Sequence, residues 1–234
     1  MLDLVIEFAD EARAPYRCHV LTIRPYYDAV LAAQAAVGSS VLALVSLTVV
    51  HFLKRDLDPS RTMISRYALG PYGWLMAVCF EAWAAASALL FVALTPGPSS
   101  TLDRVGQYLL LATSIGLALA AGFPMDQAGT PRREMSFSGR VHGIAFLVGV
   151  PALVLATTIL SFSLAGHSSH AAIPLLLLTV TIWLSLIAMI GIGAMVGPDH
   201  GPNPHVPWIF GWVNRLLMVA YSVWLIVVAW PLAH

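Results

Sequence analysis

A run of apolar residues, IPLLLLTVTIWLSLIAMIGIGAMV (Ile173–Val196), contains no Asp, Glu, Lys or Arg. A helix that crosses a bilayer needs about 20 consecutive, mostly apolar residues, and this run is long enough. Five further runs of the same kind are bounded by charged residues or by Pro and Gly: Ala29–His51, Tyr72–Leu94, Val105–Phe123, His142–Leu164 and Trp212–Trp230. Because lipid offers the backbone no hydrogen-bond partners, each run is predicted to be a helix, which gives six transmembrane helices.

The composition favours the same class of protein. Hydrophobic residues make up 59% of the chain and charged residues 10%, whereas a soluble domain carries about a quarter charged residues. The 12 Lys and Arg equal the 12 Asp and Glu, so the chain lacks the strongly basic character of a nucleic-acid-binding protein. We predict an all-α, polytopic membrane protein in which residues 1–28 form an extramembrane arm and residues 29–234 form a six-helix transmembrane bundle.

Basic residues are distributed unevenly between the predicted loops. The loops after the first, third and fifth runs contain Lys54, Arg55, Arg61, Arg66, Arg132, Arg133, Arg140 and Arg215. The loops after the second and fourth runs contain only Arg104. Since Lys and Arg stay on the cytoplasmic side, we expect an inner-membrane protein with both termini outside the cytoplasm.

The first residues of the arm have the pattern of a short amphipathic helix. Four apolar residues recur at helical spacing, namely Leu2, Val5, Ile6 and Ala9, and the opposite face is acidic. An acidic face is poorly suited to anionic lipid, which attracts basic segments. We therefore predict that this arm docks onto another protein or onto the outer loops of this chain.

Three segments carry a resemblance to a known family. HFLKRDLDPSRTMISRYALGPYGWLM (His51–Met76) is similar to the first cytoplasmic loop and second span of the bacterial and archaeal family called domain of unknown function 998. FPMD (Phe123–Asp126) and GRVHG (Gly139–Gly143) continue the pattern. The resemblance implies a six-span membrane protein without an assigned activity. The family usually has an acid after Ile-Ser, where this chain has Arg66, and its N-terminal segment is usually shorter.

The cytoplasmic loops contain residues of both charges. Arg61, Arg66 and Arg140 could pair with Asp58 and Asp126 of neighbouring loops. Such pairs are either ordinary solvated contacts or parts of an ordered cap over that end of the bundle. Ser138 is a predicted N-cap for the fourth helix.

Glu81 is the one acid well inside a predicted span. A charged carboxyl at that depth is costly unless it faces a partner or a wet cavity. It could bind a proton, an ion or a donor group of a bound molecule. Alternatively, it is an uncharged structural carboxyl bonded to a polar neighbour such as Ser87, Thr113 or Ser114.

His51 ends the first span and His142 begins the fourth, so both are expected near the cytoplasmic face. Two histidines on facing helices could bind a b-type haem. The chain has no GxSxG, HExxH or Walker A motif, and we expect neither a resident metal nor an enzymatic activity.

These features lead to three functional hypotheses. The leading one is a non-catalytic accessory or scaffolding subunit without a cofactor, which docks onto a larger respiratory or photosynthetic membrane assembly and contacts lipid or pigment. The first alternative is a haem-binding electron carrier that uses His51 and His142. The second is a proton-coupled transporter that uses Glu81.

Overall fold

A computed structural model describes residues 14–97, 100–127, 129–166, 169–196 and 207–234. The predicted docking residues Leu2, Val5, Ile6 and Ala9 lie outside the described residues. From Ala14 onward the chain is helical without a break through the predicted boundary at residue 28.

The described chain is built from helices and contains no strand. Its elements are α1 (Ala14–Leu53), the 3-10 helix η1 (Ile64–Ala68), α2 (Gly73–Leu94), α3 (Thr101–Gly122), α4 (Phe137–Ala165), α5 (Ser169–Val196), α6 (Phe210–Ala229) and the 3-10 helix η2 (Trp230–Leu232). Each of the six α-helices contains a segment long and apolar enough to cross a bilayer. The prediction of a multi-pass, six-helix membrane protein is confirmed.

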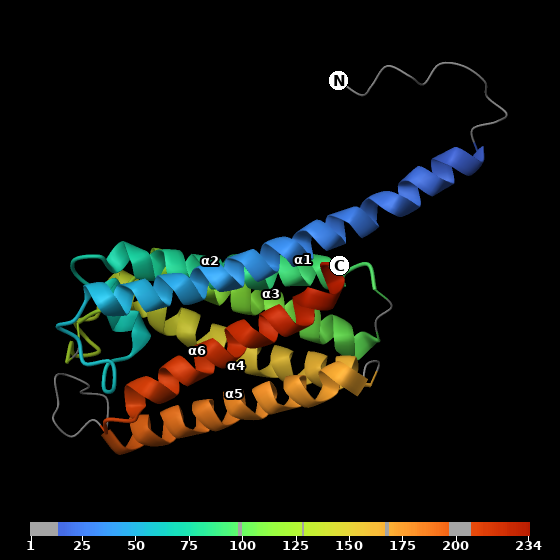
Figure 1. The fold of residues 1–234 in the computed structure, drawn as a ribbon. Helices are drawn as coiled ribbons and strands as arrows, with labels where there is room; N and C mark the ends of the chain where they lie inside the picture. The colour runs from blue at the N-terminus through green and yellow to red at the C-terminus, as the bar shows by residue number, and fades with distance from the viewer. Residues whose placement is uncertain (1–13, 98–99, 128, 167–168, 197–206) are drawn as a thin grey trace, which may run out of the picture.

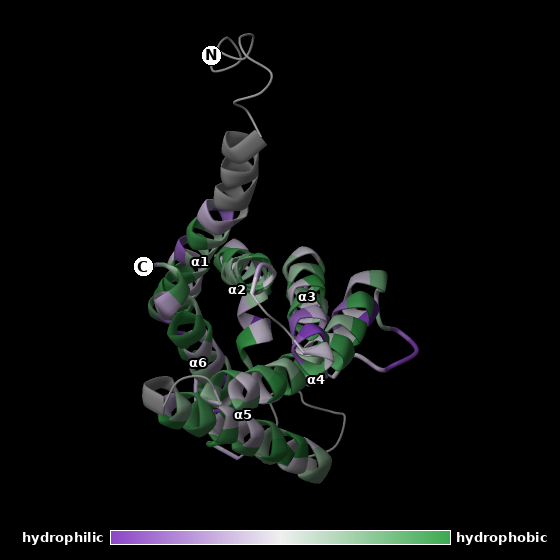
Figure 2. Ribbon diagram, turned by 90° about the vertical axis from the view of Figure 1, so that its right-hand side faces the viewer, coloured by the Kyte–Doolittle hydropathy of each residue, from purple (hydrophilic) through white to green (hydrophobic). Residues whose placement is uncertain are grey.

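The helices form a closed bundle in which each packs mainly on its neighbours in the chain (Figure 1). α6 returns against α1 and also contacts α2, which closes the interior. The start of α1 projects past the ends of the other helices (Figure 1). Apolar residues cover the outside of the bundle as well as its interior, as expected where the solvent is lipid (Figure 2).

Side-chain caps explain why α3 and α4 begin earlier than their hydropathy predicts. α3 starts at Thr101, because the Ser100 side chain accepts a hydrogen bond from the Asp103 N–H while the Asp103 carboxylate accepts from the Ser100 N–H. α4 starts at Phe137, and its N-cap is Ser136, so the prediction of Ser138 as the cap is wrong. Ser136 has extended backbone angles and accepts from the Gly139 N–H at 3.0 Å, whereas Ser138 is already helical.

Buried polar side chains in the middle of the bundle pair with one another. The Trp83 indole donates to Ser222 Oγ at 2.7 Å, and the Trp224 indole donates to Ser161 Oγ at 2.7 Å. Ser87 and Tyr221 share a hydrogen bond of 2.7 Å. Because these groups are buried among apolar side chains, such pairing offsets the cost of burying them and holds α2, α4 and α6 in register.

α3 and α4 approach each other closely at a pair of glycines, Gly116 and Gly149. A Cβ added to Gly116 would lie 2.7 Å from the Gly149 Cα, which is closer than real Cβ atoms come to backbone. The absence of side chains here lets the two backbones touch.

We therefore expect Gly116→Ala to lower the thermal midpoint of the purified protein, because the two helices must separate to make room for the methyl group. Gly143→Ala is the matched control, since a Cβ on Gly143 of α4 meets nothing within 4 Å. Thermal unfolding in detergent, followed by tryptophan fluorescence, measures both. Equal midpoints for the two variants would contradict the close contact.

Candidate functional site

The segment between α1 and α2, residues 54–72, folds under the end of the bundle and is held there by Arg215 of α6. The Arg215 Nε–H donates to His51 Nε2 at 2.7 Å, and Nη1 donates to the carbonyls of Thr62 at 2.7 Å and Gly211 at 2.9 Å. The guanidinium also lies 5.3 Å from the centre of the Tyr67 ring. One buried side chain thus joins α1, α6 and the loop.

The residues just before Arg215 add two contacts to the same loop. Asn214 Oδ1 accepts from the Ile64 N–H at 2.9 Å, and the Gly211 N–H donates to the Ser60 carbonyl at 2.7 Å. A Cβ on Gly211 would lie 2.2 Å from the Pro59 carbonyl oxygen, so only glycine permits this approach. The loop is therefore fixed against the start of α6.

Lys54 fixes the other side of the loop. Its side chain is buried, and Nζ donates to the carbonyls of Tyr67, at 3.1 Å, and of Leu69. Loss of hydration lowers the pKa of Lys54 and raises the pKa of the Tyr67 hydroxyl. The sequence singled out Arg215 and Lys54 only as loop charges, and both are interior residues.

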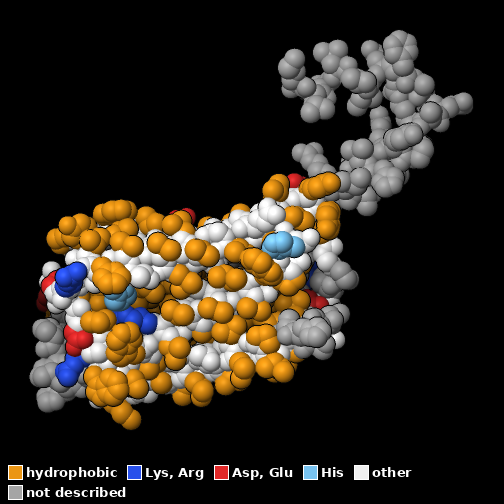
Figure 3. Space-filling model, in the orientation of Figure 1, with side chains coloured by type: hydrophobic (Ala, Val, Ile, Leu, Met, Phe, Trp, Pro, Cys, Tyr) orange, Lys and Arg blue, Asp and Glu red, His pale blue; other side chains and the backbone are white. Residues whose placement is uncertain are grey.

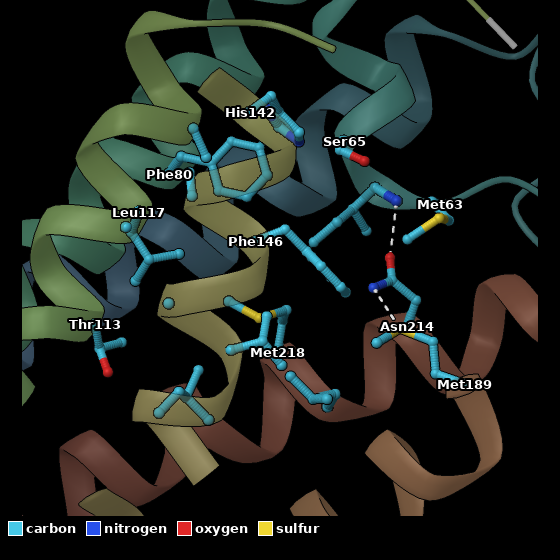
Figure 4. A pocket seen from close by; sticks show the side chains of 18 residues that line it. Met63, Ser65, Phe80, Thr113, Leu117, His142, Phe146, Met189, Asn214 and Met218 are labelled. Atoms are coloured by element: carbon cyan, nitrogen blue, oxygen red, sulfur yellow. Dashed lines mark hydrogen bonds between the residues drawn. The ribbon is translucent and has the colours of Figure 1, made fainter. Parts of the chain in front are cut away.

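A cavity of about 60 Å³ lies behind this loop, between η1 and five of the helices (Figure 4). It has room for a few water molecules. Its walls are mainly apolar, with polar side chains supplied by Ser65, Thr113, His142 and Asn214. His142 Nδ1 donates to the Phe123 carbonyl at 2.9 Å, which fixes the imidazole at the edge of the cavity.

The two predicted haem histidines have different surroundings. His51 Nδ1 is bonded to the Leu47 carbonyl and Nε2 accepts from Arg215, so both ring nitrogens are engaged. His142 instead packs against Phe80, with ring centres 6.3 Å apart. Coordination of iron by His51 would require its bond to Arg215 to break, which disfavours the haem hypothesis.

Glu81 lies on the outer surface of α2 and is exposed. It is not hydrogen-bonded to the neighbours expected from the sequence, because Glu81 is exposed whereas Ser87, Thr113 and Ser114 are buried and bonded elsewhere. Ser87 pairs with Tyr221, Thr113 donates to the Leu109 carbonyl, and Ser114 donates to the Ala84 carbonyl. The alternative of an internally bonded structural carboxyl is therefore wrong.

Of the predicted ion pairs, Asp58 with Arg61 is present, within one loop instead of between neighbouring loops. Asp58 and Arg61 approach to 3.7 Å within one exposed loop. Hydrogen bonds from Ser60 are the main reason that the pKa of Asp58 is lowered.

Asp126 accepts from the Ser136 N–H at 2.9 Å, and a Cβ on Gly139 would collide with its carboxylate. Asp126 therefore contacts the beginning of α4, while Arg140 is exposed and Arg66 is half-buried in η1. Among the described residues, no three His, Cys, Asp or Glu side chains gather in a way that could hold a metal ion.

Replacing Arg215 by Met should release the loop, because three hydrogen bonds from one charged donor are lost. We expect a loss of about 2–4 kcal/mol of stability and faster tryptic cleavage after Lys54, Arg55 and Arg61. Leu216→Ala, which changes an exposed neighbour, is the control. Limited proteolysis with mass spectrometry identifies the cut sites, and unchanged cleavage of the Met variant would refute the anchoring role.

Comparison with known proteins yields one match. The family model described as a protein of unknown function, DUF998, matches residues 37–231. No curated protein and no solved structure matches the chain. The match spans α2 to α6 and the last part of α1, including the loop held by Arg215, the cavity and Glu81.

Proposed function

The chain belongs to the DUF998 family of membrane proteins, and we propose that it is a non-catalytic subunit that binds another integral membrane protein through the outer face of α2. The observation that carries this proposal is the exposed carboxyl of Glu81 within a membrane-spanning helix.

Glu81 lies deeper in its span than any other charged residue of the described spans. It is about 12 Å along the helix from Gly73 and about 20 Å from Leu94, at 1.5 Å per residue. The other charged residues lie within the first turn or two of their spans: Asp28, Asp103, Arg104, Arg140 and Arg215. A carboxyl facing hydrocarbon at this depth is costly, and a polar partner from outside the bundle would remove that cost.

The bundle interior offers little for transport or catalysis. Several of its serine, threonine, tryptophan and tyrosine side chains are used in hydrogen bonds between helices. Within the described part, the buried side-chain atoms without a partner are Ser185 Oγ and Arg215 Nη2. Glu81 points away from this interior, which favours a role at an interface over a proton path through the bundle.

The outer face of α2 consists of Trp74, Val78, Glu81, Ala85 and Val92, four of which are exposed and Ala85 partly so. This pattern suits an apolar partner helix that presents one donor, such as Arg, Lys, Asn or Trp, at the depth of Glu81. A second copy fits poorly, because two parallel copies related by a two-fold axis would place Glu81 against Glu81. The partner we propose is therefore a different membrane protein.

We expect Glu81→Leu to abolish co-purification of this partner from native membranes and Glu81→Gln to weaken it, because only the glutamine can still accept a hydrogen bond. Leu177→Gln, on the exposed face of α5, is the control and should retain the partner. Quantitative mass spectrometry of gently solubilised complexes measures all three. Retention of the same partner by Glu81→Leu would exclude this face as the interface.

The orientation proposed from the basic residues has its own test. On the face shown in Figure 3, Lys and Arg side chains gather mainly at the end of the bundle where α1 ends and α6 begins. An epitope tag at His234 should be accessible from outside the cytoplasm, and a tag at Gly129 only from inside. Labelling of intact cells and of inverted vesicles measures this, and the reverse pattern would overturn the proposed topology.

A further inference from the structure

A second, larger pocket lies on the other side of the α1–α2 loop. Its volume is about 540 Å³, within the range of small-molecule sites. The end of α1, the loop and the residues before α2 form most of its wall, and Gln127 closes the far side. It is thus located where the apolar spans meet the loop end of the bundle.

Two cationic side chains and one acid line this pocket, so its net charge is positive. Lys54 and Arg66 are the cations, and the exposed Asp56 is the acid. An ammonium group has three N–H donors, and Lys54 uses two of them on the Tyr67 and Leu69 carbonyls. These bonds hold the Lys54 ammonium at the wall and leave one donor for a ligand.

The other residues that line the pocket are mainly apolar, so the pocket can bind a molecule that has both a charged and an apolar part. Leu53, Leu57, Leu69 and Pro71 provide apolar surface beside the cations. Tyr72 completes the rim and has a left-handed backbone with φ 60°, a conformation that a bulky residue rarely adopts. Strain of this kind is retained where the surrounding structure fixes the residue, and clusters at ligand sites.

We propose that this pocket binds a phosphate-bearing anion between Lys54 and Arg66, and that the phosphodiester headgroup of an anionic membrane lipid supplies it. Arg and Lys are the side chains that recognise phosphate, and basic pockets at the ends of transmembrane helices bind anionic headgroups. The pocket volume leaves room for glycerol beside the phosphate, and the apolar wall includes the exposed Leu53 at the end of the membrane-spanning helix α1. This inference does not depend on the proposed partner of α2.

The test uses the full-length protein in mixed micelles of phosphatidylglycerol and phosphatidylcholine, with retained lipid counted by native mass spectrometry. We expect phosphatidylglycerol to be retained in preference to phosphatidylcholine. Arg66→Gln should lower its retention about five-fold, as expected for one cation near a headgroup. Arg61→Gln, the same change in the same loop but outside the pocket, should leave retention unchanged.

A variant that is expected to increase lipid retention distinguishes an effect on ligand binding from damage to the fold. Asp56→Asn removes the acid of the pocket and should increase phosphatidylglycerol retention, which a destabilised protein would not do. In a parallel arm, inorganic phosphate and glycerol 3-phosphate are added as competitors. Displacement of lipid only by another anionic lipid identifies the membrane as the source, whereas displacement by the soluble phosphates identifies a free phosphate compound. Retention that is the same in Arg66→Gln, Asp56→Asn and the unmodified protein would overturn the proposal.

Discussion

The loop end of the bundle depends on the hydrogen bonds of one buried guanidinium, that of Arg215. The guanidinium of Arg215 bonds to His51 at the end of α1, to Thr62 in the loop and to Gly211 one turn earlier in α6. Hydrogen bonds offset the cost of burying a cation, and here imidazole and carbonyl acceptors on Nε and Nη1 take the place of a carboxylate, while Nη2 has no partner among the described residues. Because these acceptors come from separate segments, the end of α1, the start of α6 and the loop must come together in one arrangement.

That arrangement produces two hollow regions, one on each side of the loop. The loop closes the small cavity beside His142 on its inner side, and it forms the pocket of Lys54 and Arg66 on its outer side. A flexible loop would provide neither space, because the walls include backbone and side chains that Arg215, Asn214 and Lys54 fix. The ordered cap over the bundle, one of the two alternatives raised by the loop charges, thus arises from bonds between these side chains and loop backbone more than from ion pairs.

The sequence predicts the existence and number of the helices well, because about 20 apolar residues without charge have few other structures open to them. It does not predict which side of a helix faces inward, since each span is apolar on all sides and lacks a polar stripe to mark the surface. Glu81 is the clearest case, for its depth follows from the sequence but its outward direction depends on how α1 and α3 pack on α2. On α2, the small residues Ala82 and Ala86 are four positions apart and both are buried, so their spacing does indicate the side that packs on other helices. The anchoring role of Arg215 could not be predicted from the sequence, because it depends on contacts with residues more than a hundred positions away in the chain.

We propose that polar groups inside the bundle stabilise the fold and that the outer face of α2 binds a partner membrane protein. Site-specific photo-crosslinking in native membranes tests it most directly, with a photoreactive residue at Val78, one turn from Glu81, and another at Leu177 on α5. The account predicts a discrete adduct with a second membrane protein from position 78 and adducts with lipid alone from position 177. Lipid adducts alone from both positions would contradict it.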